Sequence, residues 1–221
     1  MRIPDTFEVT GGQKLQGTIA PQGAKNEALQ IICATLLTAE PVIIQNVPRI
    51  LDVMHLLDVL EGLGATVEWL SSESVRIQAA RIDTSSFHSN QYQEDARKIR
   101  GSVMLLGPML ARFGKAYLPK PGGDKIGRRR LDTHFQGLEH LGAHLKYDAR
   151  QEQYFVEAQK LVGNYVLMDE ISVTGTANLI MGAVLAEGTT QIYNAACEPY
   201  VQQLCRMLNS MGAKISGIGS N

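Results

Sequence analysis

The sequence predicts an α/β protein assembled from three consecutive copies of one unit of strands and helices. The first observation is a recurring Gly-Ala pair preceded by Leu or Met, which begins at residues 64, 142 and 212. The second is that the same series of apolar segments precedes each pair, at spacings of 78 and 70 residues. Alternating strands and helices at this period favour α/β units. With 44% hydrophobic and 19% charged residues, the 221-residue chain can also bury a sizeable core.

Each unit opens with an apolar helix that is followed by a short strand. The helices are expected at residues 26–37, 100–110 and 178–185, and the strands at 42–45, 115–118 and 190–193. Because the helical segments are apolar almost all round, we expect these helices to lie inside the fold.

An amphipathic helix then runs into each Gly-Ala stop, where glycine is the expected C-cap. In the first unit its apolar residues recur at the spacing of one helical face, at Val53, Leu56, Leu57, Leu60 and Leu63. Two strands follow, expected at 65–70 and 74–78 in the first unit and at 144–147 and 153–157 in the second. The third unit stops soon after Ile215, so we expect its last strand to be missing and the chain to be part of a longer protein.

Charge and cysteine usage exclude several classes of protein. Basic and acidic residues number 21 and 22, which excludes a generic basic nucleic-acid binder. The three cysteines form no CxxC pair, which favours a reducing compartment. We find no apolar leader, and the most apolar stretch, 103–113, is too short to span a bilayer. We therefore expect a cytoplasmic protein that binds neither membrane nor nucleic acid.

No metal or other cofactor is expected. His140 and His144 are four residues apart, but Gly142 should end the helix between them, so the two imidazoles do not share a helical face. The sequence also contains no Walker loop and no dinucleotide-binding fingerprint.

The start of each apolar helix is polar. Residues 23–26, 97–100 and 172–176 carry Lys, Arg, Ser, Thr or Asn side chains. Repeat symmetry would turn the three helix N-termini toward one surface, and helix N-termini bind anions through free amides and the helix dipole. Ordinary capping by Ser, Thr and Asn is the alternative, and both explanations stay open.

The loop at residues 120–134 combines Gly and Pro with several cations, which suggests close backbone approach to a phosphate held by arginine. Asp124 lies between Gly123 and Lys125, where it is exposed and positioned for acid–base chemistry. The alternative is a solvated basic turn in which Asp124 is simply a turn former.

These motifs closely resemble the UDP-N-acetylglucosamine enolpyruvyl transferase family. The resemblance covers essentially the whole chain and corresponds to the first half of that enzyme. It rests on Gly23-Ala24-Lys25-Asn26, Asn46-Val47-Pro48, Pro121-Gly122-Gly123 with Ile126-Gly127 and Arg129, Glu187-Gly188-Thr189-Thr190, and Asn194-Ala195-Ala196-Cys197-Glu198-Pro199.

Membership implies two domains, each made of three βαβαββ-type units arranged as an inside-out α/β barrel. Residues 1–20 would be a strand segment that packs with the second domain, and residues 21–221 would be the three-repeat domain, truncated at its last strand. The implied reaction transfers enolpyruvyl from phosphoenolpyruvate to the 3-hydroxyl of UDP-N-acetylglucosamine and releases phosphate. This is the first committed step of peptidoglycan synthesis, and so serves cell wall biogenesis, cell shape and cell division. We expect the 221-residue chain alone to be inactive.

The resemblance also implies residue roles. Lys25 and Asn26 would hold phosphoenolpyruvate, and Asp124 would be the proton donor. Many members carry a cysteine at that position, so fosfomycin resistance is expected here. UDP-N-acetylglucosamine would bind Arg100, Arg129, Arg130, Leu131, Asp132, Thr133, Glu170, Ser172 and Val173.

Three positions depart from the family pattern. Arg130 stands where many members have proline, Met104 where some have an aromatic residue, and Glu170 where the position is often basic.

Two alternatives are kept. A related enzyme shares the fold and uses 3-phosphoshikimate, but the stretch from Arg129 to Thr133 matches the sugar-nucleotide branch. The other alternative is a non-catalytic paralogue that only binds a nucleotide sugar. Retention of Lys25, Arg100 and Asp124 together argues against it.

Overall fold

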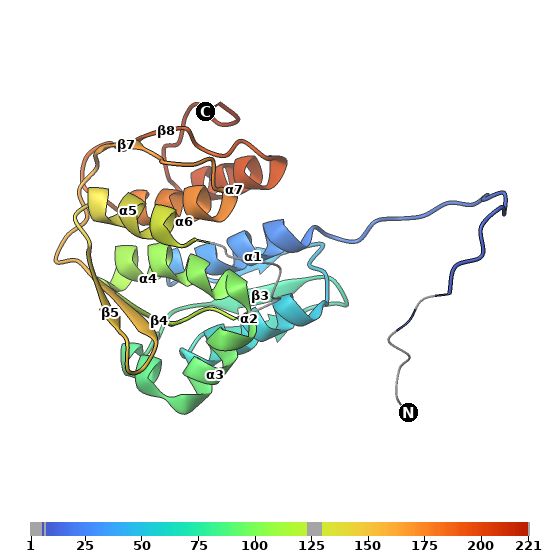
Figure 1. Cartoon of the computed structure of the whole chain (residues 1–221), viewed down its shortest axis with the longest axis horizontal. Helices are drawn as coiled ribbons and strands as arrows, with labels where there is room; N and C mark the ends of the chain where they lie inside the picture. The colour runs from blue at the N-terminus through green and yellow to red at the C-terminus, as the bar shows by residue number, and fades with distance from the viewer. Residues whose placement is uncertain (1–5, 7, 123–129, 221) are drawn as a thin grey trace.

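A computed structural model describes residue 6, residues 8–122 and residues 130–220 of the chain (Figure 1). The first unit contains α1 (Lys25–Ala34), the 3₁₀ helix η1 (Thr35–Leu37), β1 (Val42–Ile44), α2 (Leu51–Gly62), β2 (Thr66–Trp69) and β3 (Val75–Gln78). The second contains η2 (Thr84–His88), α3 (Asn90–Lys98), η3 (Arg100–Leu105), α4 (Leu106–Phe113), β4 (Lys115–Pro119), α5 (Asp132–His140), β5 (His144–Asp148) and β6 (Gln153–Glu157). The third contains β7 (Tyr165–Leu167), α6 (Val173–Ala183), β8 (Gln191–Tyr193) and α7 (Pro199–Ser210).

The first two units form matching antiparallel sheets. Their strand orders are β1-β3-β2 and β4-β6-β5, with Ile43 opposite Arg76 and Tyr117 opposite Phe155. The third unit differs, because β8 pairs in parallel with β7 and the described residues add no other strand to that sheet. In the first unit, the edge of β1 that faces away from β3 borders a groove instead of a strand.

The apolar helices α1, α4 and α6 lie together in the middle of the molecule, and the three sheets lie outside them (Figure 1). Every residue of α1 from Ala28 to Ala34 is buried, as is every residue of α6 from Gly175 to Gly182. A helix that is apolar all round must have neighbours on every side. The predicted placement of the first helix of each unit inside the fold is therefore confirmed.

The three predicted helix stops share one geometry. Gly64, Gly142 and Gly212 have φ angles of 97°, 99° and 107°, in the left-handed region that favours glycine. After each glycine, the alanine N–H donates back to a carbonyl in the last helical turn: Ala65 to Leu60, Ala143 to Leu138 and Ala213 to Leu208. These are Schellman-type C-caps, and they explain why the Gly-Ala pair recurs.

Two of the family-like motifs meet through a close backbone approach. Asn46, two residues after β1, has a φ of 57°, and its carbonyl oxygen lies where a Cβ on Gly23 would be. Only glycine fits there, so Gly23 fixes the chain just before α1 against the turn after β1. Asn194 repeats this left-handed turn after β8, with φ 59°.

Some predicted boundaries were wrong. Arg97 and Lys98 do not open the second apolar helix, because they form the last turn of α3, and η3 begins at Arg100 as a 3₁₀ helix. The third apolar helix begins at Val173, five residues before the predicted Asn178. The sequence analysis also missed α3 and β7, since α3 is short and almost entirely polar and β7 has only three residues.

The described residues before Lys25 form neither helix nor strand and extend away from the helices (Figure 1). Val9, Leu15 and Ile19 along this segment are almost fully exposed. That residues 1–20 pack with a second domain stays a prediction. Across the residues described, no helix is both long and apolar enough to cross a membrane.

Helix α4 packs against α6 through a second close approach, which generates a stability prediction. A Cβ on Gly107 would overlap the backbone carbonyl oxygen of Asn178, whereas a Cβ on Gly62 in α2 meets nothing within 4 Å. Gly107→Ala should lower the free energy of unfolding by about 1–3 kcal/mol through overpacking. The matched control Gly62→Ala should be neutral or stabilising by up to about 1 kcal/mol, because alanine has the higher helix propensity. Urea unfolding of both variants measures the difference, and equal effects would contradict the close packing.

Candidate functional site

The starts of η3 and α5 are joined by a hydrogen bond from a predicted site residue. Arg100, the first residue of η3, donates from Nη2 to the carbonyl oxygen of Arg130 at 3.1 Å. Arg100 is half-buried, so its guanidinium keeps access to solvent while its stem packs against the protein. The bond places Arg100 beside the segment of residues 130–133 that opens α5.

The starts of α5 and α6 are joined through Thr133, which is 5% exposed. Its hydroxyl lies 2.8 Å from Asp169 Oδ1 and 3.2 Å from Glu170 Oε1, so two carboxylates share one hydrogen. The Thr133 methyl group packs on Gly175 in the first turn of α6. The structure therefore brings together Arg100, residues 130–133 and the segment from Glu170 to Val173, all of which the resemblance assigned to one ligand.

The N-termini of α1 and α6 differ in capping. Ser172 caps α6, because its Oγ accepts the Gly175 N–H at 3.1 Å. This bears out the capping explanation for that helix. The N-cap position of α1 is Ala24, which has no side chain able to accept a hydrogen bond. The first amides of α1 are therefore left for solvent or an anion.

Lys25 and Asn26 occupy the first two positions of α1 and are exposed. The Lys25 ammonium forms an ion pair with the Asp52 carboxylate in the first turn of α2, with the two side chains 49% and 38% exposed. Exposed pairs of this kind contribute only about 0–1 kcal/mol, so an incoming anion can compete with Asp52 for Lys25.

Charges of both signs gather at the start of α5. Arg130 Nε lies 2.6 Å from Asp132 Oδ2, and this hydrogen bond raises the pKa of Arg130 above its usual value. Asp169 and Glu170 contribute in the same direction from farther away. Cations for phosphate groups therefore lie beside carboxylates, which accept hydrogen bonds from hydroxyl or N–H groups but repel phosphate.

Sequence reasoning missed His134, which is 3% exposed and lies directly behind this site. Its Nδ1 lies 3.1 Å from the Asn178 amide nitrogen, and its Nε2 lies 3.1 Å from Thr174 Oγ1. Asn178 Oδ1 accepts the Gly107 N–H at 2.6 Å, and Asn178 Nδ2 also donates to the Val103 carbonyl. The Asn178 amide nitrogen is thus a donor, so Nδ1 must be the acceptor and the imidazole is neutral. A His next to a Thr at a helix start was the available signal.

The Pro-Gly-Gly turn explains a further motif. A Cβ on Gly122 would overlap the carbonyl oxygen of Arg97 at the end of α3, so only glycine allows this approach. The predicted proton donor Asp124 and the predicted ligand Arg129 lie outside the described residues.

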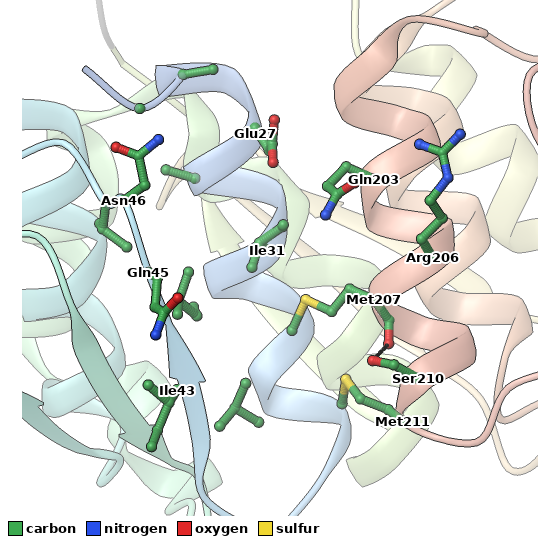
Figure 2. A pocket seen from close by; sticks show the side chains of 16 residues that line it. Glu27, Ile31, Ile43, Gln45, Asn46, Gln203, Arg206, Met207, Ser210 and Met211 are labelled. Carbon is green, nitrogen blue, oxygen red and sulfur yellow. Dashed lines mark hydrogen bonds between the residues drawn. The ribbon is translucent and has the colours of Figure 1, made fainter. Parts of the chain in front are cut away.

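No group of three or more His, Cys, Asp or Glu side chains in the described part of the chain could hold a metal ion. A groove of about 590 Å³ lies between α1, β1 and α7, and Figure 2 shows Glu27 on α1 facing Gln203 on α7 across it. Ile31, Ile43 and Met207 form its apolar floor. Gly23 and Ala24 border this groove, but its lining includes neither Lys25 and Asn26 nor any residue of the cluster at α5 and α6.

Comparison with known proteins defines the class. The profile of the family described as EPSP synthase (3-phosphoshikimate 1-carboxyvinyltransferase) matches residues 9–221. The chain therefore belongs to the EPSP synthase family.

Within that family, the chain is similar to proteins named UDP-N-acetylglucosamine 1-carboxyvinyltransferase. It is 58% identical over 216 residues to the protein of that name from Bacteroides thetaiotaomicron, and 54% identical over 216 residues to that from Porphyromonas gingivalis. Each alignment covers 98% of this chain and 50% of the relative. The chain thus spans about half the length of the curated relatives it matches, and corresponds to their N-terminal half.

Solved structures confirm the fold class. The enolpyruvyl transferase NikO from Streptomyces tendae matches with a TM-score of 0.77 and 19% identity, over 96% of this chain and 50% of that one. An EPSP synthase from Acinetobacter baumannii matches with a TM-score of 0.69 and 16% identity, over 91% and 45%. At these identities the likeness shows the fold alone.

The buried His134 generates a prediction about pH. Burial, with a smaller contribution from Arg100, lowers its pKa from 6.5 to about 4. The unfolded state then binds the proton more tightly, so stability falls as the pH drops through 6.5 toward 4. Between pH 7.5 and 5 the chain should lose about 2 kcal/mol more free energy of unfolding than His134→Gln does.

Denaturant unfolding at the two pH values measures this difference. Exposed His144 supplies the control for the loss of one imidazole, and His144→Gln should not reproduce the change caused by His134→Gln. NMR titration of the His134 ring in the unsubstituted protein is a second measurement that needs no variant to fold. An imidazole that titrates near pH 6.5 would contradict the neutral, buried assignment.

Proposed function

We propose that the chain is part of an enzyme that transfers the enolpyruvyl group of phosphoenolpyruvate to the 3-hydroxyl of UDP-N-acetylglucosamine. The observation that carries this proposal is 58% identity, over 98% of the chain, to a protein named UDP-N-acetylglucosamine 1-carboxyvinyltransferase. The product would enter peptidoglycan synthesis, whose first steps are cytoplasmic and which serves cell shape and division. The 221-residue chain alone is proposed to be inactive, because its residues supply only part of the site.

Phosphoenolpyruvate is assigned to the start of α1. The reaction needs cations and N–H donors for a carboxylate and a phosphate, and it needs them fixed before charge develops. Three features at the start of α1 attract an anion: the uncapped backbone amides, the helix dipole and the Lys25 ammonium. Asn26, exposed at the second position of the helix, adds an amide that can donate to either substrate.

UDP-N-acetylglucosamine is assigned to the cluster of Arg100, Arg129, residues 130–133 and the segment from Glu170 to Val173. Guanidinium groups match phosphate geometry, so Arg100, Arg129 and Arg130 are assigned to the diphosphate. Asp132 and Glu170 are carboxylates that accept hydrogen bonds, which suits ribose hydroxyls or the uracil N–H better than phosphate. Glu170 is therefore assigned to the nucleoside part of the ligand and not to its diphosphate.

Asp124 is assigned as the acid. The sugar hydroxyl oxygen would bond to the central carbon of the enol while Asp124 delivers a proton to the methylene carbon and a carboxylate base from the other half of the protein takes the hydroxyl proton. In the second step the bond from the central carbon to the phosphate oxygen would break, phosphate would leave with the proton held by that base, and a methyl proton would return to the Asp124 carboxylate, which restores the double bond. A free aspartate titrates near ~3.9, so its pKa must rise for it to donate at neutral pH. The negative charge of the bound substrates works in that direction.

The first prediction concerns Lys25 and Arg100 in the full-length protein, meaning this chain with its adjoining coding sequence. Charge-assisted hydrogen bonds are worth about 1.5–3 kcal/mol, so Lys25→Ala and Arg100→Ala should each lower kcat/KM at least about ten- to a hundredfold. Lys146 on β5 also forms an exposed ion pair, with Glu157 at 3.0 Å, so Lys146→Ala is a matched control with unchanged kinetics. Phosphate release with UDP-N-acetylglucosamine and, separately, 3-phosphoshikimate as acceptor measures both activity and acceptor choice. Normal kinetics of Lys25→Ala at low phosphoenolpyruvate would contradict the assignment.

The second prediction concerns Asp124. Fosfomycin alkylates the cysteine of typical family members, and a carboxylate is a poor nucleophile toward its epoxide. The full-length protein should therefore resist fosfomycin, while Asp124→Cys should gain time-dependent inactivation and keep some activity. Asp124→Asn, which has no carboxylic proton to donate, should lose most turnover. Time-dependent inactivation of the unsubstituted enzyme, or normal turnover by Asp124→Asn, would show that Asp124 is only a turn residue.

A further inference from the structure

A polar recess of about 470 Å³ lies between α3 and the β5–β6 hairpin, and none of the residues assigned to substrates lines it. Its described lining contains two arginines, one histidine and four carboxamides, and no carboxylate. The residues are His88, Asn90, Gln93, Arg97, Arg150, Gln151 and Gln153. A recess of this composition attracts negative charge and offers N–H donors on every side.

The acids around this recess offset only part of its positive charge. Among the described residues, the Arg150 guanidinium has no hydrogen-bonded or ionic partner, and Arg97 donates one N–H to the Gln151 carbonyl at 3.1 Å. Glu152, in the same hairpin, is paired with Lys120 at 2.9 Å and is influenced more weakly by Arg97. The Asp148 carboxylate accepts the backbone N–H groups of Arg150 and Gln151. No described carboxylate therefore forms an ion pair with either arginine of the recess.

Gln153 supplies an independent observation that the recess is built for a ligand. It is the first residue of β6 and as a whole residue only 3% exposed, and its side-chain amide has no hydrogen-bond partner in the described part of the chain. The amide atoms are not among the enclosed polar atoms that lack a partner, so they face the recess, where solvent or a ligand can reach them. Because Gln153 lines the recess, an anion there would supply an acceptor.

We propose that this recess binds a small phosphate-bearing anion through Arg97, Arg150 and the Gln153 amide. Guanidinium forks match phosphate oxygens, and the carboxamides of Asn90 and Gln93 add N–H donors at the rim. The lining has no aliphatic wall of the kind that a nucleoside or sugar site presents, so the ligand is an inorganic phosphate or a compact phosphate ester. Arg97 also supports Gly122 through its carbonyl group, so the recess backs the turn that leads toward Asp124.

Titration of the full-length, ¹⁵N-labelled protein with orthophosphate, and separately with pyrophosphate, tests this proposal. Ionic strength is held constant with NaCl. Both anions should saturate shifts of the Gln153 and Gln93 side-chain amide signals, whereas NaCl alone should not. Arg150→Gln should weaken orthophosphate binding about tenfold, as expected for loss of a charge-assisted hydrogen bond. Gln153→Met, of similar shape, should weaken it about fivefold.

The controls distinguish phosphate binding at this recess from a general effect of ionic strength on the protein's charges. Arg206 lies on α7, at the opposite end of the molecule from α3 (Figure 1), so Arg206→Gln should leave phosphate binding unchanged. Gln153→Met should also leave the melting temperature unchanged, because the amide makes no hydrogen bond within the described part of the chain. Shifts that NaCl reproduces, or equal weakening by Arg206→Gln and Arg150→Gln, would overturn the proposal. Shifts confined to signals of Arg100 and residues 130–133 would place phosphate in the substrate site and would also overturn it. None of these outcomes depends on the proposed enzyme activity.

Discussion

The packing of α4 against α6 is the constraint on which the rest of the structure depends. Gly107 lets the two helices approach until its N–H reaches the Asn178 side chain at 2.6 Å, deep in the core. Asn178 then bonds Val103 in η3 and His134 in α5, so one amide fixes three helices. Buried polar groups of this kind must all be paired, and a fully paired network specifies one arrangement. The starts of η3, α5 and α6 can therefore hold their positions without a bound ligand.

This network sets the chemistry of the surface above it. Because His134 is neutral, the positive charge at the site comes from Arg100 and Arg130 and not from the imidazole beneath them. The carboxylates of Asp169 and Glu170 converge on the Thr133 hydroxyl. The surface therefore has a cationic side, formed by the two arginines, and a side of hydrogen-bond acceptors, formed by the carboxylates. A ligand that carries both phosphates and hydroxyl groups can use such a divided surface, whereas a simple anion can use only half of it.

The repeat, the buried first helices and the glycine stops could all be predicted from the sequence, because each is a local pattern with a direct physical cause. The family and the N-terminal-half assignment were likewise confirmed by comparison. The start of α6 was misplaced, since Thr174, Gly175 and Thr176 have low helix propensity, and the Ser172 cap and burial of Gly175 and Thr176 favour the helix there. His134 was missed because its role depends on Asn178, 44 residues away. The periodicity of apolar residues and the spacing of motifs do not predict a contact between two residues so far apart in the sequence.

The three units share the order of apolar helix, short strand and amphipathic helix, and the proposed site arises where they stop being equivalent. If symmetry alone governed the helix starts, all three would be capped in the same way. Instead Ser172 closes the start of α6, Arg100 opens η3 with a guanidinium, and Ala24 leaves the amides of α1 unused beside Lys25. An uncapped helix start lowers stability unless another acceptor takes the free N–H groups. The first unit thus leaves helix N–H groups without a side-chain acceptor, and in the proposed function the bound phosphoenolpyruvate would be that acceptor.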